Sequence, residues 1–156
     1  GSGMSADDRT LSPSPTFHVS GISAGMTVSH IRGLPTWLME YFDPAEALDI
    51  IERDRITIFT GFDTIFMALL THPRFSPERV VSMRRLRMAT GPAMHERVYA
   101  GFPNLAVTSR CFAMTETCGP TATTFPHQAT LAAQKYSNGS VIPGIELRIA
   151  DPADGP

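Results

Sequence analysis

The chain has 156 residues, of which 42% are hydrophobic and 18% are charged, and its net charge is −2. This composition supports one domain with a packed core and argues against disorder over the whole chain. The weak negative charge offers no basic surface to nucleic acid, so we expect no nucleic-acid partner. No apolar run approaches the ~20 residues that a transmembrane helix needs, and no secretory signal is found, so we expect a cytoplasmic protein.

The two ends of the chain look less regular than its middle. The Gly-Ser-Gly sequence at residues 1–3, ahead of Met4, resembles residues left by an expression vector, so residues 1–8 are expected to be a tag and a disordered start. The main domain is expected over residues 9–151. Residues 152–156 end without a closing element, as a truncated chain would.

The spacing of cysteine and histidine gives no sign of a metal site built from side chains alone. Cys111 and Cys118 are seven residues apart and lack the CxxC spacing of zinc ligands. We expect two reduced thiols, as in cytoplasmic proteins. The five histidines are scattered without an HxxxH or HExxH arrangement.

Helix-like and strand-like segments alternate through the middle of the chain, which predicts βαβ units and a mainly parallel sheet. The first helix is expected to begin at Pro44, with Asp43 as its N-terminal cap and Glu46 at the spacing of a capping box. A β-branched strand follows at residues 56–59, and Asp63 is expected to cap the next helix.

The remaining segments continue this alternation. We expect a short helix at 76–78, a strand at 86–89, a helix at 93–101, a strand at 105–109 and a half-exposed strand at 145–149. The charged residues from Arg74 to Arg87 are expected to form a solvated face, and Trp37 to pack at the edge of the sheet. Together these segments predict an α/β fold, a three-layer αβα subdomain around a mainly parallel sheet.

The stretch from Phe112 to Phe125 breaks the alternation. It is rich in threonine, glycine and proline and has no helical or strand period, and long irregular loops inside a domain are often functional. Phe112, Thr115 and Glu116 follow a predicted strand, and ligands of α/β sheets bind beyond the carboxyl ends of strands. The ring could stack on a base, the hydroxyl could donate to a phosphate, and the carboxylate could hold Mg²⁺. The same residues would also suit an ordinary turn in which Thr115 and Glu116 start a helix.

The sequence Phe-Ala-Met-Thr-Glu at residues 112–116 resembles the Tyr-Gly-x-Thr-Glu signature of the adenylate-forming, or AMP-binding, superfamily. This superfamily includes acyl-CoA synthetases, aryl-CoA ligases, adenylation domains of peptide synthetases and luciferases. Three further segments resemble motifs of the same family in the same order: residues 15–21 (Pro-Thr-Phe-His-Val-Ser-Gly), residues 89–94 (Ala-Thr-Gly-Pro-Ala-Met) and residues 139–146 (Gly-Ser-Val-Ile-Pro-Gly-Ile-Glu). The resemblance implies that the chain is a piece of the large N-terminal domain of such a ligase.

The resemblance also implies a role for each matching residue. Phe112 would stack on the adenine, Thr115 would donate a hydrogen bond to the α-phosphate, and Glu116 would bind Mg²⁺. His18 would orient the acyl carboxylate and gate the tunnel used by CoA, so Thr115, Glu116 and His18 are the expected catalytic residues. The wall beside the adenine is expected from Gly91, Pro92, Ala93, Ala113 and Met114, and the acyl pocket from Gly61, Phe62 and Gly119.

The implied reaction is attack of a carboxylate oxygen on the α-phosphate of ATP, which gives acyl-AMP and pyrophosphate. A thiol of CoA or of a carrier-protein pantetheine then takes the acyl group. Both first reactants are anions, so the rate depends on positioning and on neutralised charge. The implied cofactors are ATP, Mg²⁺ and coenzyme A, and the implied substrate is a fatty or aryl carboxylic acid. The family's phosphate loop and its C-terminal domain with a lysine are not found in the sequence, so we expect an inactive fragment that needs the missing segments of its parent chain.

Two other functions stay open. The sequence Gly-Ile-Ser-Ala-Gly at residues 21–25 fits the nucleophile elbow of α/β-hydrolases, in which Ser23 would be the nucleophile of an esterase and Asp63 and His127 its partners. Few residues precede Ser23, whereas an elbow needs a sheet before it, and small residues that open a helix explain the pattern better. The chain could also be a stand-alone, non-catalytic binding module derived from the ligase fold.

Overall fold

The computed structural model describes residues 3–124 and 135–151, and the strands within these residues form one sheet. Their order across the sheet is β2-β1-β3-β4-β5-β6-β7. The strands are β1 (Thr10–Ser12), β2 (Thr36–Leu38), β3 (Ile58–Phe62), β4 (Arg85–Ala89), β5 (Val107–Met114), β6 (Gly119–Thr123) and β7 (Ser140–Val141). Neighbouring strands from β2 to β5 pair in parallel, and β6 and β7 are added antiparallel at one edge. The predicted mainly parallel sheet is therefore confirmed.

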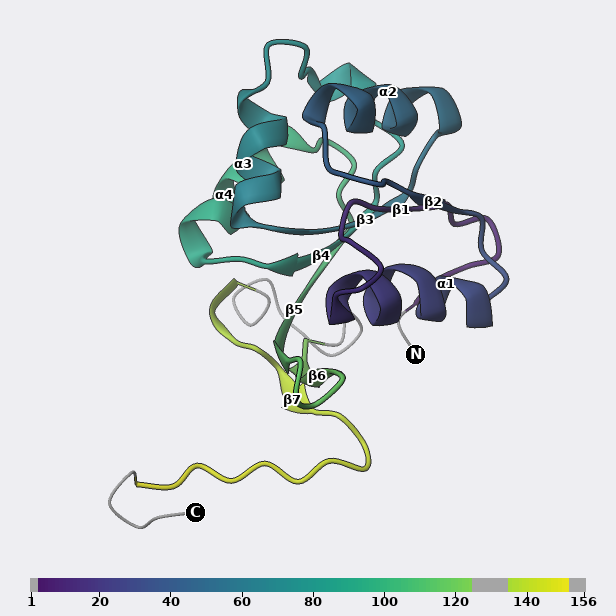
Figure 1. The fold of residues 1–156 in the computed structure, drawn as a ribbon. Helices are drawn as coiled ribbons and strands as arrows, with labels where there is room; N and C mark the ends of the chain where they lie inside the picture. The colour runs from purple at the N-terminus through teal and green to yellow at the C-terminus, as the bar shows by residue number, and fades with distance from the viewer. Residues whose placement is uncertain (1–2, 125–134, 152–156) are drawn as a thin grey trace.

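Helices cover both faces of this sheet (Figure 1). One face carries α2 (Pro44–Asp54), α3 (Asp63–Thr71) and α4 (Pro92–Gly101), with the short 3₁₀ helix η2 (Pro77–Val80) beside α2. The other face carries a π-helix, η1 (Ser20–Thr27), which continues into α1 (Val28–Ile31). These are the three αβα layers that the sequence predicts. None of the helices in residues 3–124 and 135–151 has the length and apolar character to cross a membrane.

The hydrophobic core lies between the sheet and the layer formed by α2, α3 and α4. Phe59 of β3 is fully buried and meets the ring of Phe66 of α3 edge to face, with the ring centres 5.8 Å apart. Leu86 and Met88 of β4 are buried in the same cluster. Burial of a large apolar side chain of this kind stabilises a fold by roughly 1.5–3 kcal/mol. Because side chains alternate between the faces of a strand, the residues that alternate with Phe59, Leu86 and Met88 point to the opposite face of the sheet.

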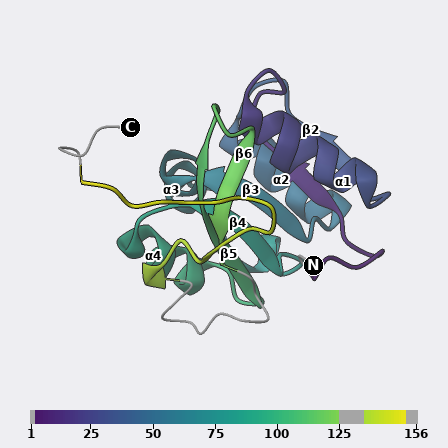
Figure 2. The same ribbon diagram turned by 90° about the horizontal axis from the view of Figure 1, so that it is seen from below.

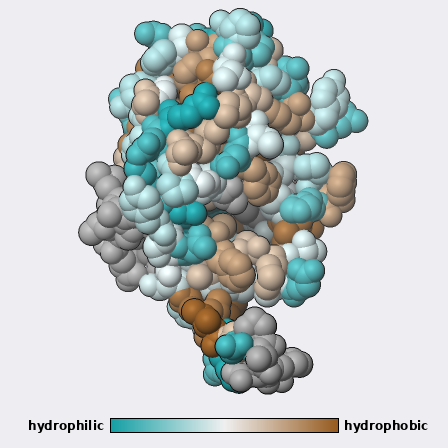
Figure 3. Space-filling view, turned by 90° about the vertical axis from the view of Figure 1, so that its left-hand side faces the viewer, coloured by the Kyte–Doolittle hydropathy of each residue, from teal (hydrophilic) through white to brown (hydrophobic). Residues whose placement is uncertain are grey.

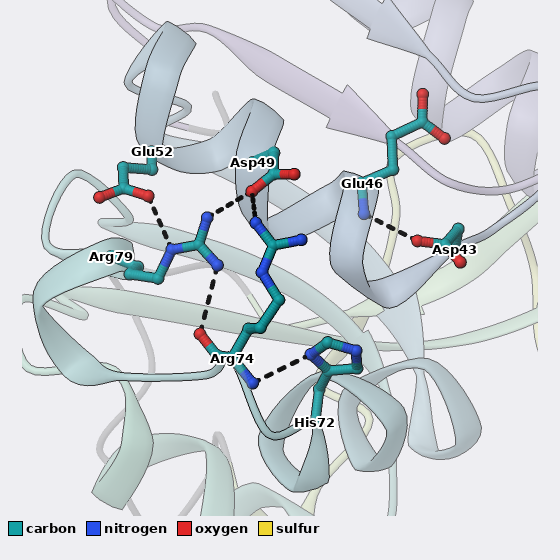
Figure 4. A network of polar contacts seen from close by, with 7 residues as sticks. All are labelled: Asp43, Glu46, Asp49, Glu52, His72, Arg74 and Arg79. Carbon is teal, nitrogen blue, oxygen red and sulfur yellow. Dashed lines mark hydrogen bonds and ion pairs between the residues drawn. The ribbon is translucent and has the colours of Figure 1, made fainter.

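Polar contacts begin α2 and fasten it to η2 (Figure 4). As predicted, the Asp43 carboxylate accepts a hydrogen bond from the backbone N–H of Glu46, at 2.8 Å. Arg79 of η2 reaches two acids of α2, since its Nε donates to Glu52 at 2.6 Å and its Nη2 donates to Asp49 at 2.5 Å. The two acids are largely exposed, so water screens each ion pair and its contribution to the stability of the fold is small.

The predicted capping role of Asp63 is wrong. The N-cap of α3 is Phe62, which makes no side-chain capping hydrogen bond, and Asp63 is the first helical residue. Its carboxylate instead accepts a hydrogen bond from the backbone N–H of Gly91, at 3.3 Å. The reason is that β3 runs directly into α3, which leaves Asp63 facing the neighbouring loop. This contact ties the end of β3 to the loop after β4.

The predicted irregular loop from Phe112 to Phe125 is also wrong over most of its length. β5 continues to Met114, and β6 returns antiparallel to it from Gly119. Threonine is β-branched and suits a strand, and a bulge between Phe112 and Ala113 hides the alternation that would have revealed β5. The hairpin extends one edge of the parallel sheet beyond its last parallel strand.

The predicted half-exposed strand at residues 145–149 is not observed. This segment has no strand partner within the described residues, and it runs as extended chain away from the sheet. Ile149 is 93% exposed and Leu147 is 44% exposed, and Figure 3 shows hydrophobic surface next to the C-terminal end. The alternating pattern was a correct sign of extended backbone, but a strand also needs a neighbour to accept its hydrogen bonds.

Asp8 anchors the start of the chain beneath the sheet, so the folded part begins before the predicted limit at residue 9. Its carboxylate is fully buried and accepts hydrogen bonds from the Thr57 hydroxyl at 2.6 Å, the Ser5 backbone N–H at 2.8 Å and Arg84 Nε at 2.9 Å. Burial alone would raise the pKa of Asp8. The hydrogen bonds from Thr57, Ser5 and Arg84, with the positive charge of Arg84, outweigh burial and lower the pKa below its ordinary value.

We predict that Asp8→Asn lowers the free energy of unfolding near neutral pH by about 1–3 kcal/mol, because it leaves Arg84 and Thr57 without their charged acceptor. The folded-state pKa of Asp8 is depressed, so its stabilisation is complete above the ordinary aspartate value and is lost as the pH falls through the folded value. Urea unfolding should therefore show a large difference between the two proteins near neutral pH and a small one in acid. Asp7→Asn, at an exposed neighbour, is the control, and an equal loss in both variants would contradict this role of Asp8.

Candidate functional site

A cavity of about 690 Å³ lies on the face of the sheet opposite the hydrophobic core. Its floor is formed by residues of β3, β4 and β5, with η1 on one side and the β5–β6 hairpin on another. Figure 2 shows η1 and α1 over the β1–β2 side of the sheet, next to the strands of this floor. The cavity therefore opens where loops from several parallel strands meet.

The structure brings most of the predicted site residues to this cavity. Those that line it are His18, Gly61, Phe62, Phe112, Ala113, Met114, Thr115 and Gly119. Those that lie outside its lining are Gly91, Pro92, Ala93 and Glu116. Both groups come from the carboxyl ends of parallel strands or from the hairpin that follows β5, which is the edge where ligands of α/β sheets bind.

The turn between β5 and β6 presents Thr115 and Glu116 to solvent. It is closed by a hydrogen bond from the backbone N–H of Cys118 to the carbonyl oxygen of Thr115, at 3.0 Å. The Thr117 hydroxyl donates to the carbonyl oxygen of Gly119 at 2.8 Å, which fixes the far side of the turn. Thr115 and Glu116 thus lie in a tight turn between two strands and do not start a helix. Their side chains are free to meet a ligand above the sheet edge.

Gly91 leaves the backbone uncovered at the start of α4. It is the N-cap of this helix, Pro92 fills the first turn, and no side chain caps the helix end. The first backbone N–H groups of a helix have no partner inside the helix. A Cβ atom added to Gly91 would meet only a carboxylate oxygen of Asp63, at 3.9 Å. A flat ring can therefore approach the backbone here.

His18 lies in the loop between β1 and η1, at the rim of the cavity. Its Nδ1 accepts a hydrogen bond from the backbone N–H of Ser20 at 3.1 Å and lies 2.8 Å from the Ser20 hydroxyl. Because Nδ1 supplies a lone pair to this N–H, the neutral ring carries its proton on Nε2. The Nε2–H group can then donate to an anionic oxygen in the cavity.

Two arginines of the cavity floor were missed, and the prediction that they belong to a solvated face is wrong. Arg85 and Arg87 line the cavity, whereas Leu86 and Met88, which alternate with them along β4, are buried in the core. The alternation of arginine with an apolar residue over β4 was the available signal, because it places both arginines on one face of a strand. Burial lowers the pKa of the Arg87 guanidinium below its ordinary value.

Both cysteines are free thiols, as predicted. Cys111 lines the cavity, and burial raises its pKa above the ordinary value, with the nearby positive charges of Arg87 and Arg110 acting in the opposite direction. The thiol is therefore protonated at neutral pH and is a poor nucleophile. Among residues 3–124 and 135–151, no group of three or more histidine, cysteine, aspartate and glutamate side chains could hold a metal ion.

Ser23 does not have the position that a nucleophile elbow requires. It lies inside η1 and not at a sharp turn between a strand and a helix. Its hydroxyl donates to the backbone carbonyl oxygen of Val19, at 2.5 Å. Asp63 is engaged by the backbone of Gly91, and His127 lies outside the described residues.

The two glycines of the same pentapeptide have a packing role. A Cβ atom added to Gly21 would lie 2.0 Å from the carbonyl oxygen of Pro15, and one added to Gly25 would lie 2.2 Å from the hydroxyl oxygen of Ser12. Only glycine permits such close contact. The glycines therefore hold η1 against β1 and against the loop that carries His18.

Comparison with known proteins identifies relatives of the whole segment. A family model described as AMP-binding enzyme matches residues 1–156. The chain is 34% identical over 154 residues to a 2-succinylbenzoate–CoA ligase of Bacillus pumilus (strain SAFR-032), a match that covers 96% of this chain and 29% of that protein. It is 41% identical over 66 residues to a long-chain-fatty-acid–CoA ligase of Bacillus subtilis (strain 168), a match that covers 42% of this chain and 12% of that protein.

The same fold occurs in solved structures. The O-succinylbenzoate coenzyme A synthetase of Bacillus subtilis, in complex with ATP and magnesium ion, is 28% identical, with a TM-score of 0.74 over 96% of this chain and 30% of that one. Its unliganded form also gives a TM-score of 0.74, over 98% of this chain and 32% of that one. The chain thus spans less than a third of the length of these relatives.

We predict that a fluorophosphonate probe does not label Ser23, because its hydroxyl donates to a backbone carbonyl oxygen within η1 and makes no hydrogen bond to a histidine of the described residues. The check is intact mass after incubation with the probe, with Ser23→Ala and an active serine esterase as controls. Stoichiometric labelling that is lost in Ser23→Ala would support the esterase hypothesis and contradict this prediction.

Proposed function

We propose that this chain, which belongs to the AMP-binding enzyme family, is part of an ATP-dependent carboxylate–CoA ligase and supplies one wall of its active site. One observation carries the proposal. The turn after β5 places Thr115 in the lining of a cavity whose rim carries His18, with the exposed Glu116 next to Thr115 in the chain. An acid in the cavity and a nucleotide over the sheet edge would meet at this turn.

The acid would enter the cavity with its carboxylate toward the rim. The Nε2–H group of His18 is the donor that can orient it, and Ser20 keeps that tautomer in place. The Thr115 hydroxyl, on the neighbouring turn, would donate to the α-phosphate that the carboxylate attacks. Holding two reactants in line in this way lowers the barrier of such a step, because the entropy cost of bringing them together is met on binding.

The nucleotide base would lie between Phe112 and the start of α4. Phe112 is 42% exposed, which leaves its ring face available for stacking. The surface beside Gly91 is open, and Asp63 holds the Gly91 loop in position against the end of β3. Aromatic stacking and an open glycine backbone suit the flat adenine ring and need no base-specific side chain.

Glu116 is the candidate Mg²⁺ ligand of this segment. A single exposed carboxylate fits a Mg²⁺ ion that is bound mainly by substrate phosphates and water, because this ion commonly keeps several waters and takes one or two carboxylates. When bound, the ion supplies positive charge to the phosphate oxygens during transfer. The segment alone offers one wall of such a site, so we expect no turnover from it without the rest of the ligase.

In the proposed reaction, a carboxylic acid and ATP give acyl-AMP and pyrophosphate. The thiol of CoA then takes the acyl group from acyl-AMP. Fatty and aryl acids are the candidate substrates. The two unpaired cysteines support a reducing, cytoplasmic location.

We predict that Glu116→Gln, in the full-length ligase that carries this segment, lowers the rate of acid-dependent pyrophosphate–ATP exchange by about 100-fold or more. The substitution removes the charge and keeps the size of the side chain, so the exposed turn should keep its fold. Glu46→Gln, at an exposed position on α2 across the sheet, is the matched control and should exchange at the parent rate. Full exchange in Glu116→Gln would exclude the metal role, and no exchange with any acid in the parent would exclude the proposed function.

A further inference from the structure

A polar row crosses the floor of the cavity. The strand register places Arg87 of β4 beside Thr60 of β3 and Ser109 of β5, and all three line the cavity. Arg85, two residues earlier on β4, faces the same side. The row lies deeper in the sheet than the site residues of the rim, because β5 must run from Ser109 to Thr115 to reach the turn.

The two arginines give an otherwise largely apolar lining a positive charge. No aspartate or glutamate occurs among the described residues that form it. Arg87 Nη2 lies 3.6 Å from the sulphur of Met4. Both arginines also interact with other groups of the protein. A charged guanidinium in such a site attracts an anion strongly, since little water screens it.

We propose that this polar row binds a second anionic group of the acid substrate, remote from the carboxylate that is activated. The inference rests on the proposed function. Arg87 would hold the second anion, and the hydroxyls of Thr60 and Ser109 would complete the subsite. A ligase for simple long-chain acids needs an apolar floor at this depth, so the row selects against a methyl-ended chain.

The geometry also bounds the length of the substrate. Thr115 follows Ser109 by six residue steps along β5 and its end, a span of at most roughly 20 Å at the rise of a β-strand. The Arg87 side chain covers part of the distance between the polar row and Thr115, and the substrate covers the rest. The substrate class is therefore an acid whose second anion lies several bonds from the reacting carboxyl group, on an aliphatic or aryl frame.

The test compares matched acids in pyrophosphate–ATP exchange by the full-length ligase. Each aliphatic diacid from hexanedioate to dodecanedioate is paired with the monoacid of the same carbon number, and carboxyalkyl benzoates are paired with alkyl benzoates. In at least one pair, kcat/KM for the diacid should exceed that for the monoacid by about tenfold or more. Arg87→Met should lower this diacid-to-monoacid ratio about tenfold or more, and Arg87→Lys should lower it less.

The diacid-to-monoacid ratio of kcat/KM does not depend on the amount of folded protein. A less stable variant therefore still gives a clear answer. Arg97→Met, at an exposed arginine of α4 across the sheet, should keep the parent ratio. Two results would overturn the second-anion subsite: exchange that favours the monoacid in every pair, or a diacid-to-monoacid ratio that Arg87→Met leaves unchanged. The proposed function would stand in either case. Absence of exchange with every acid overturns both.

Discussion

The common direction of β3, β4 and β5 is the constraint on which the candidate site depends. Because these strands are parallel, their following loops leave the sheet at the same edge. The first residue of α3, which follows β3 directly, is Asp63, the loop after β4 contributes Gly91, and a hydrogen bond joins the two. The turn after β5 extends the same edge with Thr115 and Glu116. Residues that are far apart in the sequence therefore face the same edge of the sheet, although most of them do not contact one another.

The same strands serve two purposes because their side chains alternate. On one face, Phe59 and Leu86 pack beneath α2 and α3 and hold the fold together. On the other face, Thr60 and Arg87 lie in the cavity and are exposed to whatever enters it. A substitution on the cavity face can change the ligand with little effect on the core. Under the proposed function, this separation would let the acid substrate vary without a change in the core.

The sequence predicts the sheet and the helix layers well, for physical reasons, and most of the predicted site residues line the cavity. Helix starts such as Asp43-Pro44 are local signals, and the segment from Phe112 to Glu116 carries a family signature that needs no structure. The hairpin after Phe112 was missed because a bulge breaks its period. The failed strand at residues 145–149 and the contact between Asp63 and Gly91 depend on neighbours distant in sequence, which local patterns do not report.

The arginines of β4 show a different kind of limit. Charge suggests solvent, and Arg74 is indeed largely exposed in an ion pair with Asp49. Arg87 is equally charged but lies over the cavity, because the face of a strand decides its surroundings. Composition alone could not separate these two cases, whereas the alternation of β4 could have.

The most direct measurement is a crystal structure of the full-length ligase with a non-hydrolysable acyl-adenylate analogue. The account predicts the adenine ring against Phe112 and the start of α4, with the Thr115 hydroxyl about 3 Å from the group that replaces the phosphate. It also predicts the acyl chain in the cavity beneath His18. An adenylate bound away from the turn after β5, or an acyl chain outside the cavity, would contradict it.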